Sequence, residues 1–172
     1  MTNITGLIDY GEAGNIASIQ KALIACDAEV KIIYDPIDIS SCKRLILPGV
    51  GASNSAMEIM TKDGWTEEIK EFAKTKPILG ICLGIQILSK VGFEFGETEG
   101  LKLINAEVKL MSCKGSIPHI GFKKIDIIKK SNLFNKVNNC DEFYFMHSYE
   151  VINYTDISAL CNHGSHTFVC AR

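Results

Sequence analysis

Cys82 is the residue whose setting most suggests chemistry, because it stands between Gly80 and Gly84 in the segment PILGICLGIQIL. The residues before Cys82 form an apolar run typical of a buried strand, and those after it have the spacing of an amphipathic helix. A sharp strand-to-helix turn brings neighbouring backbone close, so the flanking positions must be small. The pattern predicts a nucleophile elbow, although a buried structural cysteine is consistent with the same sequence.

The helix expected after Cys82, over LGIQILSKV, bears on the reactivity of this thiol. The N–H groups at its start and the positive end of its dipole favour the thiolate over the thiol. The Leu83 amide is available to donate to an oxyanion that develops on a substrate. This segment therefore combines the two parts that nucleophilic attack on a carbonyl carbon requires.

A second loop, LPGVGAS at residues 47–53, ends an apolar strand with a Pro-Gly-x-Gly sequence. A glycine-rich loop at a strand end also suits a phosphate group when a helix follows it. The loop lacks the Lys-Ser/Thr of a phosphate-binding loop and does not fit G-x-G-x-x-G. We therefore interpret it as a second source of oxyanion donors beside the elbow.

The elements that must position these loops alternate along the first hundred residues. The predicted strands are 4–9, 29–35, 43–49 and 76–82, and the predicted helices are 16–25, 55–60 and 66–74. This alternation predicts an α/β fold with an open, mostly parallel sheet and helices on both faces. From about Leu101 the sequence changes to short alternating segments separated by turns, which predicts added antiparallel strands.

Composition limits the class of protein. The chain has 172 residues, of which 47% are hydrophobic, so we expect one domain over residues 1–172. Its net charge is −2, with dispersed basic residues, which argues against nucleic-acid and membrane surfaces. Seven cysteines without a Cys-x-x-Cys pair, and an N-terminal apolar run too short for a signal peptide, indicate a cytoplasmic protein without metal or cofactor.

Five motifs in order resemble the class I, or triad, glutamine amidotransferases, and within them the glutaminase subunits of imidazole glycerol phosphate synthase. The motifs are PGVGASNSAM, GICLGIQIL, GLKLINAEVKLM, PHIGF and FYFMHSYE. The resemblance runs from Ile4 to Arg172. It implies glutamine as substrate, no cofactor, and a heterodimer with a cyclase (synthase) subunit that receives the ammonia for histidine biosynthesis.

The resemblance also implies roles for individual residues. Cys82 would attack the glutamine carboxamide to give a glutamyl thioester and ammonia. The oxyanion hole would consist of the amides of Leu83 and, after a peptide flip, Val50. The residues implied to hold the substrate are Gly51, Gln86, Glu94, Ser148 and Tyr149, and those implied to contact the partner are His119, Ile120 and Phe122.

Structural roles remain open for several of these residues. Gln86 fits an ordinary exposed helix position, and Glu94 lies in a turn-rich stretch where acidic residues are common. Ile120 and Phe122 fit residues that pack under a loop, and His119 fits a hydrogen-bonded structural histidine. Only the motif match distinguishes the functional interpretation from these structural ones.

The sequence departs from the family pattern at three places. DYGEAGN is one residue longer than the usual segment, and Phe122 and Lys123 replace the usual tryptophan and asparagine. The chain contains no F-H-P-E segment, from which the family takes its general base and the carboxylate that orients it. We therefore expect a C-terminally incomplete chain with an open sheet edge and weak or absent activity.

The four histidines do not predict a substitute base. His147 belongs to a wall strand, and CNHGSH predicts a hairpin turn in which His163 and His166 are exposed to solvent. Three alternative functions stay open beside the leading one. They are a paralogous glutaminase that feeds a surface-sugar amidotransferase, a non-catalytic regulatory or scaffolding subunit, and a different cysteine enzyme on a similar elbow.

Overall fold

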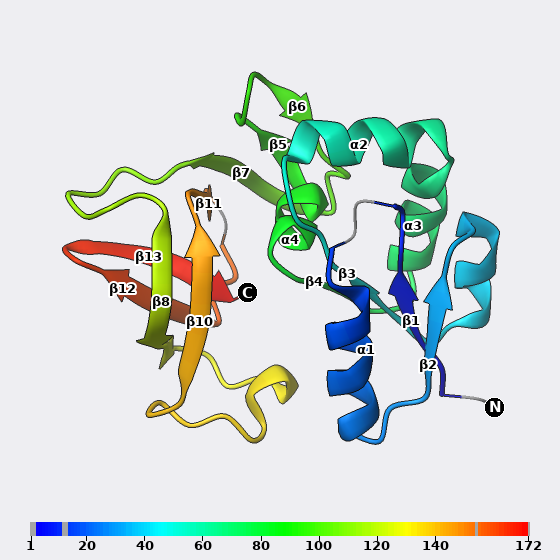
Figure 1. The fold of residues 1–172 in the computed structure, drawn as a ribbon, viewed down its shortest axis with the longest axis horizontal. Coiled ribbons are helices and arrows are strands. Elements are labelled where there is room, and N and C mark those ends of the chain that lie inside the picture. Colours follow the sequence, from blue (N-terminus) through cyan, green and yellow to red (C-terminus); the bar gives the residue numbers. More distant parts are fainter. Residues whose placement is uncertain (1–2, 12–13, 154, 172) are drawn as a thin grey trace. The chain divides into compact units, whose positions relative to one another are not determined.

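The computed structural model describes residues 3–11, 14–153 and 155–171 (Figure 1). Within it the chain forms two compact units, residues 1–104 and 105–172. The additional residue expected in DYGEAGN involves positions 12–13, which lie outside the described residues.

The first unit contains a four-stranded parallel sheet with the strand order β2-β1-β3-β4. Its strands are β1 (Thr5–Ile8), β2 (Val30–Ile33), β3 (Arg44–Leu47) and β4 (Ile78–Gly80). Its helices are α1 (Ile16–Ala25), the 3-10 helix η1 (Pro36–Ser41), α2 (Ser53–Lys62), α3 (Trp65–Ala73) and α4 (Leu83–Leu88). The alternation of strands and helices predicted from the sequence is confirmed (Figure 1).

The core of the first unit explains why its strands are almost continuously apolar. Ile8, Leu45 and Leu47 are buried in one cluster with apolar side chains of α2, α3 and α4. Their neighbours along the strands, Leu7 and Ile46, point to the opposite face and are buried as well. Strands that are covered on both faces do not alternate between apolar and polar residues.

The helix after Cys82 is shorter than the sequence predicts. It ends at Leu88, and residues 89–92 form β5 (Ser89–Gly92), which pairs with β6 (Thr98–Glu99) as an antiparallel hairpin. The carbonyl oxygens of residues 87–89 accept hydrogen bonds from the amides of residues 101–103 at 2.8–3.1 Å. A continuing helix would need those carbonyls for its own next turn, so this distant segment ends it.

The second unit is built from antiparallel strands, as predicted. Its described strands form four ladders. They pair β7 (Ile104–Leu110) with β11 (Tyr149–Ile152), β8 (His119–Lys124) with β10 (Glu142–His147), and β12 (Ala159–His163) with both β9 (Asp126–Ile127) and β13 (His166–Ala171). A short 3-10 helix, η2 (Asn132–Phe134), precedes β10. A separate apolar core forms around Met111, Ile125, Ala159, Cys161 and Phe168.

Among the described residues, the longest helices have ten residues, and none has the length and apolarity needed to cross a membrane.

Candidate active site

Cys82 lies on the turn between β4 and α4, where the sequence predicts an elbow. Its backbone has φ 55° and ψ −116°, and its side chain is exposed. A residue with a Cβ atom rarely adopts a positive φ, because the side chain crowds its own backbone. A strained residue of this kind persists only where the surrounding structure holds it in place, and such residues are frequent at active sites.

The two glycines that flank Cys82 allow this turn. A Cβ atom on Gly80 would lie 2.6 Å from the backbone nitrogen of Ile85. A Cβ atom on Gly84 would lie 1.8 Å from the carbonyl oxygen of Leu47 at the end of β3. Both positions therefore require glycine, and the absent Cβ atoms let α4 begin directly against the sheet.

Hydrogen bonds around the elbow leave the Leu83 amide available. The Ile81 amide donates to the Leu47 carbonyl at 3.0 Å, and the Gly84 amide donates to the Ile81 carbonyl at 2.9 Å. No hydrogen bond between described residues uses the Leu83 amide, which directly follows the thiol. This is the arrangement that an oxyanion donor requires.

The glycine loop, residues 48–52, packs directly against the elbow. A Cβ atom on Gly49 would lie 3.0 Å from the Cβ atom of Leu83. The next residue, Val50, is 53% exposed, and no hydrogen bond between described residues uses its amide. Gly51 follows with φ +89°, a conformation that glycine adopts without strain. The two predicted sources of oxyanion donors therefore lie side by side.

Glu94 is tied to the end of the same loop. Its Oε2 atom accepts a hydrogen bond from the Ser53 amide at 3.4 Å, at the start of α2. The helix N-terminus favours a negative charge there. The Ser53 side chain is 4% exposed, and its Oγ atom has no partner among the described residues.

Gln86 is half-buried on α4, one turn beyond Cys82.

Ser148 and Tyr149, the predicted substrate-wall residues, belong to the second unit, where β10 passes into β11. The Ser148 carbonyl accepts from the Met111 amide at 2.9 Å. The Tyr149 carbonyl lies 3.0 Å from Nδ1 of His147. Both carbonyl groups of this segment therefore have partners within the unit.

The residues predicted to contact a partner differ in exposure. His119 is 1% exposed, whereas Ile120 and Phe122 are 58% and 63% exposed. Interface membership stays a prediction for all three, and the burial of the His119 side chain supports the structural role that the sequence left open. Ile120 and Phe122 do not pack under a loop.

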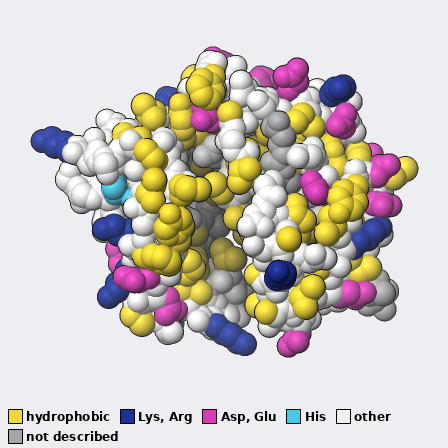
Figure 2. All heavy atoms as spheres, in the orientation of Figure 1, with side chains coloured by type: hydrophobic (Ala, Val, Ile, Leu, Met, Phe, Trp, Pro, Cys, Tyr) yellow, Lys and Arg dark blue, Asp and Glu magenta, His cyan; other side chains and the backbone are white. Residues whose placement is uncertain are grey.

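The exposed pair belongs to a larger apolar surface that the sequence did not reveal. In the β8–β10 ladder, Ile120 pairs with Met146 and Phe122 pairs with Tyr144, so all four side chains share one face. Met146 and Tyr144 are 62% and 55% exposed, and the Phe122 and Tyr144 rings lie 5.2 Å apart. Figure 2 shows hydrophobic side chains gathered over these two strands. These four residues are named the β8–β10 outer face.

The prediction that His163 and His166 are exposed was wrong, since both are half-buried. Nε2 of His163 lies 2.8 Å from the Ser116 carbonyl oxygen, and its ring centroid lies 4.2 Å from that of His119. Nε2 of His166 lies 2.9 Å from a carboxylate oxygen of Glu150. The hairpin exists as predicted, but contacts with residues distant in sequence cover its histidines.

Burial lowers the pKa of His119 to about 4, from an ordinary value of 6.5, with smaller contributions from His163, His147 and Lys123. Because the unfolded state binds this proton first, stability is expected to fall as the pH decreases from about 6.5 toward 4, by about 3 kcal/mol. Urea unfolding at a series of pH values measures this loss. His119→Gln should flatten the profile, and an unchanged slope in that variant would contradict the assignment.

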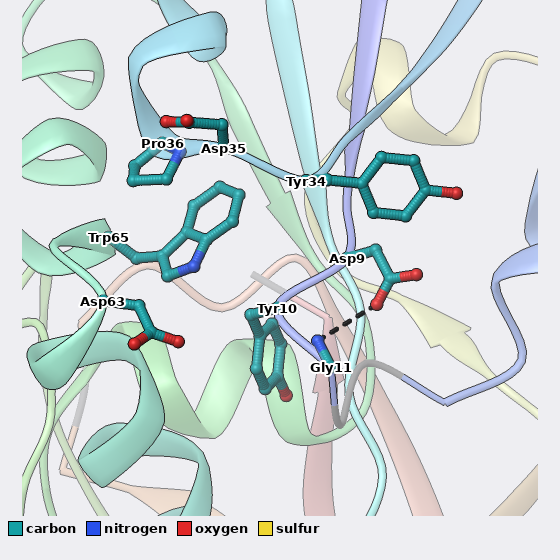
Figure 3. Close-up of a pocket in the computed structure, with 8 residues that line it drawn as sticks. All are labelled: Asp9, Tyr10, Gly11, Tyr34, Asp35, Pro36, Asp63 and Trp65. Carbon is teal, nitrogen blue, oxygen red and sulfur yellow. Dashed lines mark hydrogen bonds between the residues drawn. The ribbon is translucent and has the colours of Figure 1, made fainter.

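An open hollow of about 650 Å³ elsewhere in the first unit contains none of the predicted site residues (Figure 3). Its lining consists of Asp9, Tyr10, Gly11, Tyr34, Asp35, Pro36, Asp63 and Trp65. Asp9 accepts from the Gly11 amide and Asp35 from the Ile37 amide, so two of its three carboxylates already serve local turns. Among the described residues, no group of His, Cys, Asp or Glu is arranged to hold a metal ion.

Comparison with known proteins gives a consistent result. Residues 7–170 match the family profile described as "Glutamine amidotransferase class-I". The chain is 44% identical to "Imidazole glycerol phosphate synthase subunit HisH" of Caldanaerobacter subterraneus subsp. tengcongensis, over 85% of this chain and 72% of that protein. It is 39% identical to "Imidazole glycerol phosphate synthase subunit HisH 1" of Campylobacter jejuni, over 96% and 84%.

Solved structures agree with this at the level of the fold. A crystal structure of a glutamine amidotransferase superposes with a TM-score of 0.70 at 16% identity, and the match covers 98% of this chain and 89% of that one. The structure of PurLQS from Thermotoga maritima gives a TM-score of 0.71 at 14% identity, covering 99% and 78%.

Proposed function

Because the chain belongs to the class-I glutamine amidotransferase family, we propose that it is the glutaminase subunit of an imidazole glycerol phosphate synthase. In this function it hydrolyses glutamine to glutamate and ammonia, and it passes the ammonia to a cyclase subunit in histidine biosynthesis. The observation that carries the proposal is the elbow, with Cys82 at a positive φ against the glycine loop.

The geometry of the elbow supports a thioester mechanism. The Cys82 thiolate attacks the carboxamide carbon of glutamine, and a carbon–sulfur bond forms. Negative charge develops on the carboxamide oxygen, where the Leu83 amide and a reoriented Val50 amide donate to it. As the carbon–nitrogen bond breaks, the nitrogen takes a proton from a water molecule and leaves as ammonia, and a glutamyl thioester and hydroxide remain. Attack of hydroxide on the thioester carbonyl then breaks the carbon–sulfur bond, gives glutamate and restores the thiolate.

The surroundings of the thiol suit the remaining groups of the substrate. The Glu94 carboxylate lies at the start of α2 and provides a negative charge for the substrate's α-ammonium group. Gln86, one helical turn beyond Cys82 on α4, and the backbone of Gly51, in the glycine loop beside the elbow, provide further polar groups. Substrate contact by the backbone of Ser148 and Tyr149, which belong to the second unit, stays a prediction from the motif match.

The β8–β10 outer face suits a protein partner. It presents four large apolar side chains to solvent, and the next pair along the ladder, Glu142 and Lys124, places opposite charges at its edge. An apolar centre with a polar rim is typical of protein–protein interfaces. We assign this face to the cyclase in a heterodimer, although its chemistry differs from the family pattern at Phe122 and Lys123.

The relatives give no support to the expectation of an inactive chain, nor to the sugar-amidotransferase, scaffolding and other cysteine-enzyme alternatives. A glutaminase with a biosynthetic partner suits the cytoplasm, and the seven cysteines, all of them free thiols, suit a reducing compartment.

Substitution on the outer face tests the partner assignment. Phe122→Asp places a charge at the centre of this face and is expected to weaken cyclase binding at least about 100-fold. The measurement is the dissociation constant with an imidazole glycerol phosphate synthase cyclase, together with glutamine-dependent product formation. Ile128→Asp is the matched control, because Ile128 is 57% exposed in the same unit outside the ladder.

Loss of binding by Phe122→Asp alone would support the assignment. Equal affinity for all three proteins would overturn the assignment of this face. If the unsubstituted chain did not bind this cyclase but bound the synthase of a surface-sugar amidotransferase, that synthase would replace the cyclase as the proposed recipient of the ammonia.

A further inference from the structure

The start of helix α2 is capped by a residue that lies 41 positions beyond Ser53 in the chain. Ala52 is the N-cap residue, and its side chain makes no capping hydrogen bond. The Ser53 amide donates instead to Oε2 of Glu94, which follows strand β5 in the turn toward β6. Figure 1 shows this hairpin beside the start of α2. Both segments belong to the first unit, as does Cys82.

The contact between Glu94 and Ser53 is loose. Its N···O distance is 3.4 Å, whereas most N–H···O hydrogen bonds are about 2.7–3.2 Å long. Among the described residues, no other group donates to the Glu94 carboxylate. An ionised carboxylate has about four lone-pair sites, so the described residues leave most of its acceptor capacity unused. The amide alone therefore does little to fix the orientation of this side chain.

The Ser53 hydroxyl is a buried polar group at the start of an apolar stripe of α2. The other members of the stripe are buried at helical spacing and are Ala56, Met57 and Met60. The Ser53 Oγ atom has no partner among the described residues. Buried hydroxyls are usually hydrogen-bonded, because an unpaired one loses its hydration without compensation. Ser53 thus carries a donor beside Glu94 that the described residues do not use.

The hydroxyl and the amide of one serine can serve the same carboxylate. Because Oε2 of Glu94 contacts the Ser53 amide, rotation about χ1 of Ser53 and a small shift of the hairpin bring Oγ to that carboxylate. The tip of the hairpin is open to such a shift, since Phe95 is 82% exposed. A hydroxyl that donates to an ionised carboxylate forms a stronger bond than two neutral groups do.

The orientation of this carboxylate matters for the proposed reaction. The glycine loop leads from Gly49, which packs against Leu83 beside the thiol, to Ser53 four residues later. A glutamine whose carboxamide lies at Cys82 can therefore extend its α-ammonium group toward Glu94. An ammonium group is a compact charge with three donors, so its binding depends on where the carboxylate oxygens lie.

We propose that Ser53 is a positioning residue, whose hydroxyl donates to the Glu94 carboxylate and fixes the orientation in which it binds the α-ammonium group of glutamine. This inference rests on the proposed function, because it takes Glu94 to bind that group. Ser53 acts through Glu94 and does not touch the substrate. Its loss should weaken recognition of the α-ammonium group and leave the reactivity of the Cys82 thiol unchanged.

The test compares two chloroketones, an analogue of glutamine and the same compound without its α-amino group. With both, the Cys82 thiolate forms a carbon–sulfur bond, and chloride leaves with the electrons of the carbon–chlorine bond. Intact-mass labelling at several concentrations separates the inhibition constant KI from the maximal labelling rate kinact. The ratio of the two KI values measures recognition of the α-ammonium group. Iodoacetamide, which has no amino-acid part, reports the reactivity of the thiol alone.

Ser53→Ala removes the hydroxyl and keeps the amide and the helix. The KI of the glutamine chloroketone should rise about tenfold, while the KI of the compound without the amino group, kinact and iodoacetamide labelling stay unchanged. The melting temperature should not fall, because the hydroxyl has no partner among the described residues and a methyl group suits the apolar stripe. Ser55→Ala is the matched control, because Ser55 is exposed in the same helical turn.

Glu94→Gln shows whether Ser53 acts through the carboxylate. This variant loses the negative charge, so the KI of the glutamine chloroketone should rise at least about tenfold and that of the compound without the amino group should stay unchanged. Adding Ser53→Ala to Glu94→Gln should then change either KI by less than about twofold, since the group that Ser53 positions is already lost.

Several outcomes would overturn the proposal. They are an unchanged ratio of KI values in Ser53→Ala, an equal rise of both KI values, or a tenfold effect of Ser53→Ala that persists beside Glu94→Gln. An unchanged ratio in Glu94→Gln would also overturn it, because Ser53 would then have no ammonium-binding group to position. Failure of the glutamine chloroketone to label the unsubstituted chain, while iodoacetamide labels Cys82, would instead contradict the proposed function.

Discussion

Cys82→Ser is expected to abolish glutamine hydrolysis, with a fall in kcat of at least about 10⁴-fold. The serine hydroxyl keeps the size and position of the thiol. However, it remains protonated at neutral pH and is a far weaker nucleophile than a thiolate. The measurement is steady-state ammonia release from glutamine, with the chain alone and with the cyclase. Because the glycine loop and Glu94 are unchanged, glutamine should still bind, and calorimetry would show this.

Cys26→Ser is the control for this prediction. Cys26 is also an exposed free thiol of the first unit, but it lies at the end of α1 in a different loop. Its replacement should leave the rate of ammonia release within about twofold of that of the unsubstituted chain, because surface substitutions away from a functional site usually have small effects. Retained hydrolysis in Cys82→Ser, or equal loss in Cys26→Ser, would exclude Cys82 as the nucleophile.

Gly84→Ala is expected to destabilise the first unit by at least about 3 kcal/mol. The new methyl group would lie 1.8 Å from the Leu47 carbonyl oxygen, which belongs to the backbone of a central strand and cannot rotate away. Relief requires α4 to separate from β3. That movement would break the packing of Leu83 and Ile87 in the buried cluster and displace the Leu83 amide from the thiol. Denaturant unfolding measures the free-energy change.

Gly96→Ala separates this clash from the cost of backbone conformation alone. Gly96 has φ +115°, and a Cβ atom placed there would meet no other atom within 4 Å. The variant should therefore lose only about 1–2 kcal/mol, from the positive φ. Equal free energies of unfolding for the two variants would contradict the close approach of Gly84 to the Leu47 carbonyl. Full labelling of Cys82 in Gly84→Ala by a chloroketone analogue of glutamine would also contradict this close approach.

Sequence reasoning found the parts of the molecule that depend on residues close together in the chain. The four parallel strands and the first three α-helices follow from runs of apolar residues and from helical spacing, and helix 16–25 has the predicted bounds. The elbow follows from two glycines within two residues of Cys82. The family follows from motifs that occur in order along the chain, and the comparisons confirm it.

The features that the sequence missed depend on partners far away in the chain. The helix after Cys82 ends early because residues 101–103 occupy its last carbonyls. Tyr144 and Met146 join Ile120 and Phe122 on one face only through the register of β8 and β10. The alternation in EFYFMH indicated two faces for this strand, but not which face would be covered.

By itself, then, the sequence determined the turn that carries Cys82 and the class of fold, because local backbone sterics and apolar periodicity govern both, and it predicted Cys82 as the nucleophile. The tertiary structure alone decided that the Glu94 carboxylate accepts a hydrogen bond at the start of α2 and that the side chains of His119 and His147 form a hydrogen bond with each other. It also decided which apolar side chains remain exposed. Hydrogen bonds and cross-strand pairs between distant residues form only when the chain is folded, and no local pattern encodes their partners.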